Sequence, residues 1–170
     1  MSSARKIEGA SSVSVVVNVR KHLQLDTVFY AGNACVYADA TTIGARNKSL
    51  AELAGLIEKA IARVETEGVE SLMQWVDEQP NRSSIVSPGK RVAFSSSIVI
   101  SNWASCSDLT KNGGPFEGVT FAGPLYYPLD GVSIIADDGE GGLNVFLALV
   151  KDQTKDFLEN HLIKEFAVLR

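Results

Sequence analysis

The sequence has few residues of the kinds that bind metals, form disulfide bonds or cross membranes. Its two cysteines, Cys35 and Cys106, are far apart and belong to no CxxC pair. This excludes a zinc ribbon or a disulfide scaffold and favours a reducing compartment. With only two histidines, no metal site is expected. No apolar run is long enough for a membrane-spanning helix, and residues 1–12 lack the apolar core of a secretory signal, so we expect a cytoplasmic protein without a membrane partner.

A strong positive charge is also missing. The chain has 16 basic and 20 acidic residues, a net charge of −4, and its basic residues are scattered in short doublets. A broad basic face for binding nucleic acid is therefore excluded.

What the chain does contain is the pattern of one α/β domain. Its 170 residues suffice for a single domain with a core of its own, which we expect at residues 13–170 after a flexible lead of residues 1–12. Strands are predicted from β-branched and apolar runs at residues 13–19, 27–38, 92–100, 132–136 and 143–150. Helical patterns lie between the second and third of these strands and after the last. This order predicts a mixed β-sheet with helices packed on it.

The clearest predicted element is a helix at residues 49–64. Its apolar residues have the i, i+3, i+4, i+7 spacing of a stripe that faces a core: Leu50, Leu53, Ala54, Ile57, Ala60, Ile61 and Val64. Ser49 and Glu52 have the spacing of a capping box at the start of this helix. Beyond Gly68 a second apolar face predicts another helix.

Two polar motifs resemble ligand sites but favour simpler interpretations. Residues 137–142 (DDGEGG) carry three carboxylates that would repel phosphate, and they lack the ligand spacing of an EF-hand. We interpret them as a hairpin turn. His161 and Glu165 lie four residues apart on a predicted last helix marked by Leu158, Leu162, Phe166 and Leu169. We interpret this pair as a surface pair, because a metal site needs further ligands nearby.

Three stretches in fixed order carry a resemblance to a known family. They are residues 17–20 (VNVR), 29–34 (FYAGNA) and 98–103 (IVISNW). Together they resemble the arginine-bearing strand, the Tyr-Phe-Gly-Asn element and the Thr-Ser-Trp segment in the C-terminal half of the BAHD-type acyltransferases of plants and fungi, which have a chloramphenicol acetyltransferase-like fold. The resemblance covers nearly all of the chain. Residues 116–123 (FEGVTFAG) depart from the family, because its Asp-Phe-Gly-Trp-Gly motif has lost the aspartate and the tryptophan.

His22 and Asp26 have the HxxxD spacing of the family's catalytic motif, in which the histidine is the general base. In the family that motif lies in the N-terminal half and is usually followed by glycine. Here the pair falls between the arginine and the Gly-Asn element, and Thr27 follows it. We therefore interpret His22 and Asp26 as non-catalytic, so that the chain lacks the lobe that supplies the base.

The resemblance implies an enzyme that transfers an acyl group from acyl-CoA, as co-substrate and without a bound cofactor, to a hydroxyl or amine of a small molecule, a secondary metabolite. It implies that Ser101 donates a hydrogen bond to the oxyanion and that Trp103 walls the acyl or acceptor pocket. It also implies that Arg20 forms a structural ion pair with the aspartate of the catalytic motif, while Gly32 and Asn33 permit a special backbone turn. The implied partner is a complementary N-terminal lobe, in cis or in trans.

Other interpretations stay open from the sequence. Ser101 can be an ordinary strand-end serine, and a packing role suits Trp103 equally well. Because a fold does not fix a function, a synthase or cyclase on the same scaffold is an alternative, as is a non-catalytic ligand- or partner-binding domain. An exposed apolar surface would favour an incomplete enzyme, whereas a polar, sealed surface would favour an independent binding module.

Overall fold

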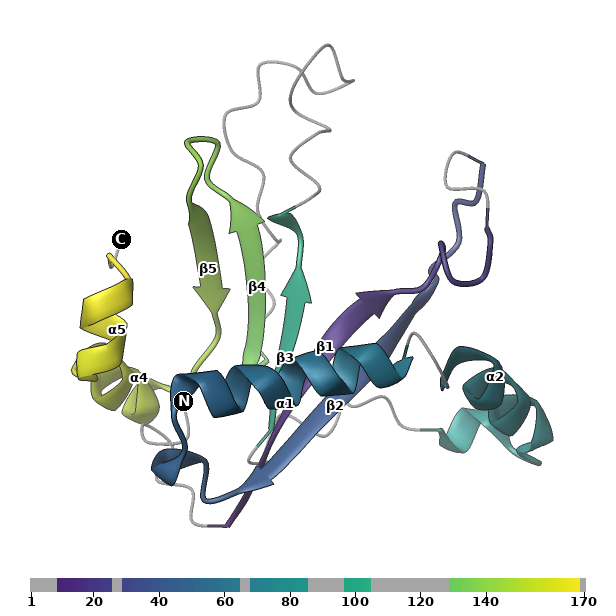
Figure 1. The fold of residues 1–170 in the computed structure, drawn as a ribbon, viewed down its shortest axis with the longest axis horizontal. Helices are drawn as coiled ribbons and strands as arrows, with labels where there is room; N and C mark the ends of the chain where they lie inside the picture. The colour runs from purple at the N-terminus through teal and green to yellow at the C-terminus, as the bar shows by residue number, and fades with distance from the viewer. Residues whose placement is uncertain (1–8, 26–28, 65–67, 86–96, 105–128, 169–170) are drawn as a thin grey trace.

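The computed structural model describes residues 9–25, 29–64, 68–85, 97–104 and 129–168 (Figure 1). The strands are β1 (Ala10–Asn18), β2 (Cys35–Ile43), β3 (Ser97–Asn102), β4 (Val132–Asp137) and β5 (Leu143–Leu147). The helices are α1 (Leu50–Arg63), α2 (Val69–Glu78), α4 (Lys151–Leu158) and α5 (His161–Phe166), with two short 3-10 turns at Ala45–Asn47 and Arg82–Ser84.

The strands form one five-stranded mixed sheet in the order β2-β1-β3-β4-β5. β1, β3 and β4 are parallel to one another, and the two edge strands β2 and β5 are antiparallel to their neighbours. The predicted mixed α/β architecture is therefore confirmed. The boundaries differ: β1 begins at Ala10, inside the segment expected as a lead, and β2 begins at Cys35, eight residues after its predicted start.

α1 packs on one face of the sheet through very small side chains. Ala60 of α1 lies against Ala38 and Ala40 of β2, and all three are buried. Larger side chains complete the contact from both sides: Val17, Leu56, Ile57, Ile61 and Val64. The C-terminal part of the predicted apolar stripe thus faces the core, whereas Leu50 and Ala54 of the same stripe are exposed. The small alanine side chains let the helix backbone lie close to the strands.

Strand register assigns each side chain to a face. Ala38 and Ala40 point toward α1, so their partners Val15 and Val13 on β1 do as well. Side chains of neighbouring positions point the other way. We call the side that α1 covers the helix face and the other side the opposite face.

The predicted capping box is present at the start of α1. Ser49 Oγ accepts from the Glu52 backbone N–H at 3.2 Å, and the Ser49 backbone N–H donates to Glu52 Oε2 at 2.8 Å. The bond from the Ser49 backbone N–H lowers the pKa of the Glu52 carboxyl most. The bond from the Ser49 hydroxyl to the same carboxyl lowers it further.

We expect Ser49→Ala to lower the free energy of unfolding by about 1 kcal/mol at neutral pH, because the Glu52 N–H loses its acceptor. Urea denaturation measures this, with Ser71→Ala on exposed α2 as the matched serine control. Since the lowered pKa belongs to the folded state, the carboxylate stabilises the protein above the ordinary pKa of 4.5 and stops doing so as the pH falls through the lowered value. The stability of the wild type should therefore fall in acid. Ser49→Ala keeps the backbone N–H bond to the carboxylate and loses only the one from the hydroxyl, so the difference between the two proteins should shrink only slightly in acid. A difference that grows as the pH falls would contradict the capping box.

The C-terminal helix differs from its prediction. The sequence pattern indicated one helix, whereas the structure has two, α4 and α5, with the break at Glu159 and Asn160. Asn160 Oδ1 accepts from the Leu162 N–H at 3.0 Å and caps α5, so a local side-chain bond starts a new helix there. Leu169, predicted on the same stripe, lies outside the described residues.

The acidic turn joins β4 and β5 as a hairpin, as predicted. Gly139 and Gly141 have φ of +83° and +92°, a conformation that favours glycine. Asp138 Oδ1 accepts from the N–H groups of Glu140 and Gly142 at 2.9 and 2.8 Å, so this carboxylate stabilises the turn itself. Among the residues that the structure describes, no three His, Cys, Asp or Glu side chains come together as a metal site.

Candidate functional site

The candidate site lies at the end of the sheet toward which the parallel strands β1, β3 and β4 all run (Figure 1). We call this end the carboxyl edge. In open α/β sheets, ligands bind outside the carboxyl ends of the strands. Ser101 is the next-to-last residue of β3, Trp103 follows that strand directly, and Arg20 follows β1. The topology therefore brings the three sequence-predicted residues to the same edge.

Ser101 and Trp103 form a direct pair. The indole Nε1–H of Trp103 donates to Ser101 Oγ at 3.0 Å, and the Trp103 backbone N–H donates to the Ile135 carbonyl at 2.7 Å, which fastens the residue to β4. The register places Ser101 opposite Val16 and Ile134, on the opposite face of the sheet. The serine oxygen thus receives a hydrogen bond while its own proton stays available to donate.

Trp103 therefore has a geometric role that the sequence did not reveal. It was predicted as a wall of a pocket, and the residue is 38% exposed. The structure adds that the ring orients the neighbouring serine hydroxyl. Spacing i, i+2 across a strand end is the only sequence signal for this pair, because side chains at i and i+2 point to the same face.

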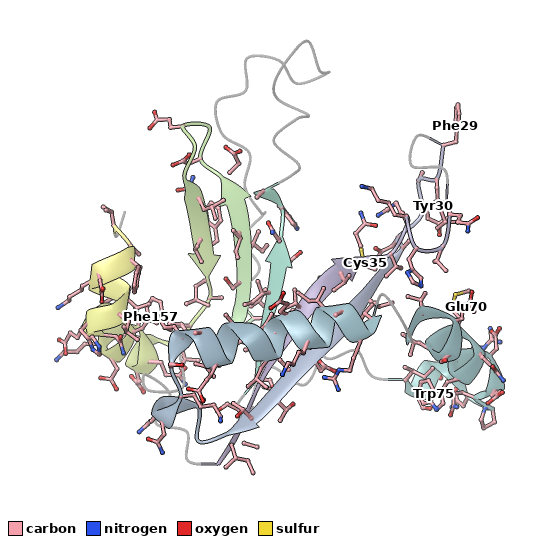
Figure 2. All side chains as sticks on the ribbon, in the orientation of Figure 1. Phe29, Tyr30, Cys35, Glu70, Trp75 and Phe157 are labelled. Atoms are coloured by element: carbon pink, nitrogen blue, oxygen red, sulfur yellow. The ribbon has the colours of Figure 1, made fainter. Side chains whose placement is uncertain are left out.

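Arg20 ties together the connection between β1 and β2. Its guanidinium donates to the Gly32 carbonyl at 2.6 Å and to Asn18 Oδ1 at 3.2 Å, and it lies 5.8 Å from the centre of the Tyr30 ring, a cation–π distance. Tyr30 lies in this connection (Figure 2). Among the described residues its partners are neutral. The ion pair predicted for Arg20 stays a prediction about a carboxylate outside this part of the chain.

Gly32 lies in close contact with a neighbouring aromatic ring. Its φ does not lie in the left-handed region that favours glycine. A Cβ at Gly32 would instead come within 2.6 Å of the Tyr30 ring. The glycine therefore permits close approach of the ring that stacks on Arg20. Asn33 is exposed, and its side chain makes no hydrogen bond with the described residues.

No role was predicted from the sequence for Tyr30, which lies in the same connection. An aromatic residue two positions before a glycine, in a connection that also contains an arginine, was the available signal. His22 lies exposed in the turn after β1, while Asp26 lies outside the described residues, so the non-catalytic interpretation of this pair stays a prediction. Residues 116–123 also lie outside them.

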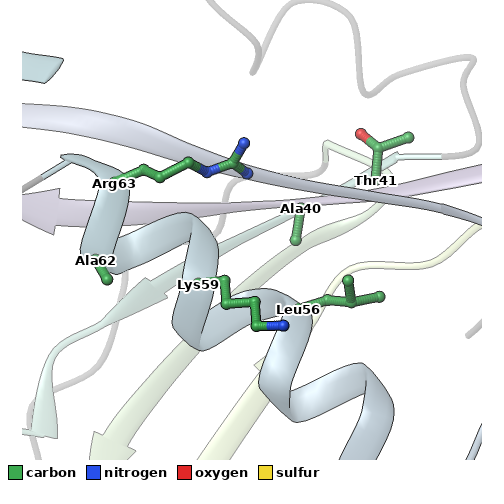
Figure 3. A pocket seen from close by; sticks show the side chains of 6 residues that line it. All are labelled: Ala40, Thr41, Leu56, Lys59, Ala62 and Arg63. Carbon is green, nitrogen blue, oxygen red and sulfur yellow. The ribbon is translucent and has the colours of Figure 1, made fainter. Parts of the chain in front are cut away.

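A groove of about 490 Å³ lies at the other end of the sheet, between edge strand β2 and α1 (Figure 3). Its floor comes from Ala40, Thr41, Leu56 and Ala62, and Lys59 and Arg63 extend along it. The sequence did not indicate this groove, because it arises from the alanines that bring α1 close to β2. Neither Ser101 nor Arg20 lines it.

A mixed five-stranded sheet with helices packed on it is the architecture of one lobe of the chloramphenicol acetyltransferase-like fold. The chain has the fold of such a lobe, and the predicted resemblance to BAHD-type acyltransferases is confirmed for the fold. No helix of the described residues is both long and apolar enough to cross a membrane.

The solved structures with this fold include TRI101 of F. sporotrichioides, complexed with coenzyme A and T-2. The chain matches it with a TM-score of 0.78 at 16% identity, over 98% of this chain and 42% of TRI101. TRI101 of F. graminearum, complexed with coenzyme A and deoxynivalenol, gives 0.73 at 17% identity, over 96% of this chain and 39% of that one.

Vinorine synthase gives a TM-score of 0.63 at 14% identity, over 87% of this chain and 34% of that enzyme. TRI101 and vinorine synthase are both BAHD acyltransferases. The sequence itself matches no family model and no curated protein. The chain thus spans less than half the length of the structures that it matches.

Proposed function

We propose that the chain is the C-terminal lobe of an acyl-CoA-dependent acyltransferase that acts on a small molecule, a secondary metabolite. One observation carries this proposal: a hydroxyl donor, Ser101, is held by Trp103 at the carboxyl edge of a sheet whose fold is shared with a coenzyme A-bound acetyltransferase. Acyl-CoA is the co-substrate, and a complementary lobe supplies the general base.

Ser101 acts in this mechanism on the charge that develops during attack. A histidine of the complementary lobe takes the proton of the acceptor hydroxyl or amine, and the acceptor attacks the thioester carbonyl of acyl-CoA. The carbonyl oxygen becomes negative in the tetrahedral intermediate and needs donors that are already in place. The intermediate then collapses, the C–S bond breaks, and CoA leaves as a thiol with the proton that the histidine took up. Since the Trp103 indole N–H donates to Ser101 Oγ, the Ser101 hydroxyl proton can point at the oxyanion.

Arg20 supports the site from the neighbouring strand end. Its bond to the Gly32 carbonyl and its stack on Tyr30 hold the guanidinium in one place, so remaining donors stay available to a carboxylate of the complementary lobe. The proposed ion pair would fasten the catalytic loop of that lobe to this one. Trp103 borders the substrate while it orients Ser101.

The isolated chain should have no measurable transferase activity, because the proposed general base belongs to the complementary lobe. Release of free CoA from acetyl-CoA in the presence of an alcohol acceptor measures this. The same assay on the chain joined to a first lobe with an HxxxDG motif tests the proposed function and should show transfer. Robust transfer by the isolated chain, abolished by His22→Ala, would instead show that His22 is the base.

A second candidate is a domain that binds a ligand without catalysis. The groove between β2 and α1 favours it, since Lys59 and Arg63 extend along an otherwise largely apolar floor and suit a ligand with an apolar body and an anionic group. Calorimetric titration with CoA separates the two candidates. Binding that Lys59→Gln and Arg63→Gln abolish, in a joined protein without transferase activity, would favour this second candidate.

A further inference from the structure

The outer edge of β2 offers unpaired backbone groups. The Val19 N–H donates to the Ala34 carbonyl at 3.0 Å, so by the alternation of an antiparallel pair the even-numbered positions of β2 bond to β1. The N–H and C=O groups of Tyr37, Asp39 and Thr41 therefore face away from β1. β2 is the last strand of the sheet, and these six groups have no hydrogen-bond partner among the described residues.

The groove between β2 and α1 reaches this edge. Ala40 and Thr41 both line the groove, although their side chains point to opposite sides of β2 (Figure 3). Ala40 contributes its side chain to the floor, so Thr41 borders the groove through the strand backbone, whose outward N–H and C=O groups are unpaired. A ligand in the groove thus meets an apolar floor beside a backbone donor and a backbone acceptor. Another extended peptide has the matching groups.

Two unpaired cations extend along the same groove. Lys59 and Arg63 are exposed, and neither forms an ion pair with any residue that the structure describes. They lie four residues apart on α1, which is about 6 Å along a helix. Side chains at i and i+2 of an extended strand lie about 6.6 Å apart on one face. Two carboxylates separated by one residue of an added strand therefore match the spacing of the two cations.

The described carboxylates around the groove do not neutralise these cations. Glu52 is held in the capping box, about 10 Å or more along the helix from both of them. Glu58 lies about 100° or more around the helix from both. The Asp39 side chain is on the opposite face of the sheet, where Ser14 Oγ donates to it at 2.5 Å. Glu70, in the first turn of α2, forms no ion pair with a described residue.

We propose that the β2 edge binds an extended acidic segment of another polypeptide, which adds a strand to the sheet and places two carboxylates, one residue apart, on Lys59 and Arg63. Apolar side chains on the same face of the segment contact the groove floor. The residues between them are polar and neutral, because they lie on the side of Asp39. This association goes beyond the proposed acyl transfer and does not depend on it, since Ser101 does not line the groove.

A second copy of the chain fits this edge less well. On the helix face β2 carries Val36, Ala38, Ala40 and Thr42, and none of them is a carboxylate. Two β2 edges paired with each other would leave the cations of both copies unpaired. A fatty acid would meet the cations, but it would leave the outward backbone groups of Thr41 without partners.

Titration of the full chain with the peptide Val-Thr-Glu-Thr-Glu-Thr-Val, with blocked ends, tests this site. The glutamates and valines share one face of the extended peptide, and the threonines share the other. The control peptide Val-Glu-Thr-Thr-Thr-Glu-Val has the same composition and charge, but its glutamates lie four residues apart. Calorimetry should show that the control binds at least tenfold more weakly than the first peptide.

Hydrogen exchange should locate the bound peptide by an alternating pattern along β2. The amides of Tyr37, Asp39 and Thr41 face outward and should become protected when the peptide is added. The amides of Ala38 and Ala40 already bond to β1 and should not change.

Three variants separate the contributions of charge and of strand pairing. Lys59→Gln combined with Arg63→Gln should weaken binding of the peptide roughly tenfold, because two exposed ion pairs are lost. Thr41→Pro removes one outward N–H, leaves the bonds to β1 in place and should weaken binding as well. Lys155→Gln, at an exposed position of α4, should bind like the wild type. Circular dichroism checks that each variant is folded.

Equal binding of the two peptides would overturn the proposal, because net charge alone would then explain the affinity. Binding that leaves the amides of Tyr37, Asp39 and Thr41 unprotected would also overturn it, since the peptide would lie elsewhere. Failure of the peptide to bind would overturn it too. Binding of CoA that depends on Lys59 and Arg63 would then assign the groove to a small anion.

Discussion

Replacing Ser101 by alanine in the joined two-lobe enzyme is expected to lower kcat roughly a hundredfold, while KM changes little. Loss of one preorganised oxyanion donor typically costs about 3 kcal/mol of transition-state stabilisation. The effect falls on kcat because the hydrogen bond strengthens only when the carbonyl oxygen becomes negative. Steady-state kinetics with acetyl-CoA and a fixed acceptor measure both parameters.

Two matched variants make this result specific. Ser101→Thr keeps the hydroxyl and introduces the residue that the resembled family usually has, so its turnover should stay near that of the wild type. Ser97→Ala removes a hydroxyl from the same strand and the same face, where Ser97 Oγ bonds to Ser12 Oγ at 2.6 Å instead of lying at the carboxyl edge. Unchanged turnover in Ser101→Ala would reduce Ser101 to an ordinary strand-end residue.

The second large effect is expected in the core. Ala60→Leu should lower the free energy of unfolding by roughly 1–3 kcal/mol, because three added carbons have no room between α1 and the alanines of β2. Ala60 is 3% exposed, and its contacts Ala38 and Ala40 are 1% and 9% exposed. Urea denaturation of the full chain gives the difference.

Ala54→Leu is the control for this change, since it adds the same atoms at an exposed position of the same helix. It should leave stability near that of the wild type. Equal destabilisation by both variants would point to helix propensity and not to packing. Equal stability of both would show that α1 does not lie closely on the alanines.

The strands and α1 were predictable because each depends on a local pattern. The β-branched residues around Val15 favour a strand over a helix. The Ser49–Glu52 capping box marks a helix start by side-chain chemistry alone. The late start of β2 was less predictable. Residues 29–34 read as strand by composition, but Arg20 draws the Gly32 carbonyl to itself and holds that segment as a connection.

The candidate site was predictable as a set of residues and not as a geometry. Sequence order placed Ser101 and Trp103 near each other, but the indole-to-hydroxyl bond depends on the twist and register of β3 against β4. The close contact between Gly32 and Tyr30 leaves no trace in a sequence pattern. The groove arises from packing between distant segments, which a single sequence does not display.

The bond between Trp103 and Ser101 also gives the site an optical signal of its own. Indole fluorescence responds to the hydrogen bonding of the ring N–H and to the polarity around the ring. Emission from Trp103 therefore depends on the strength of its hydrogen bond to Ser101 Oγ. The chain has one other tryptophan, Trp75, which lies on α2 and not at the sheet edge (Figure 2). Replacing Trp75 by phenylalanine would leave a single fluorophore in contact with the proposed oxyanion donor, and its spectrum would follow occupancy of the site without any added label.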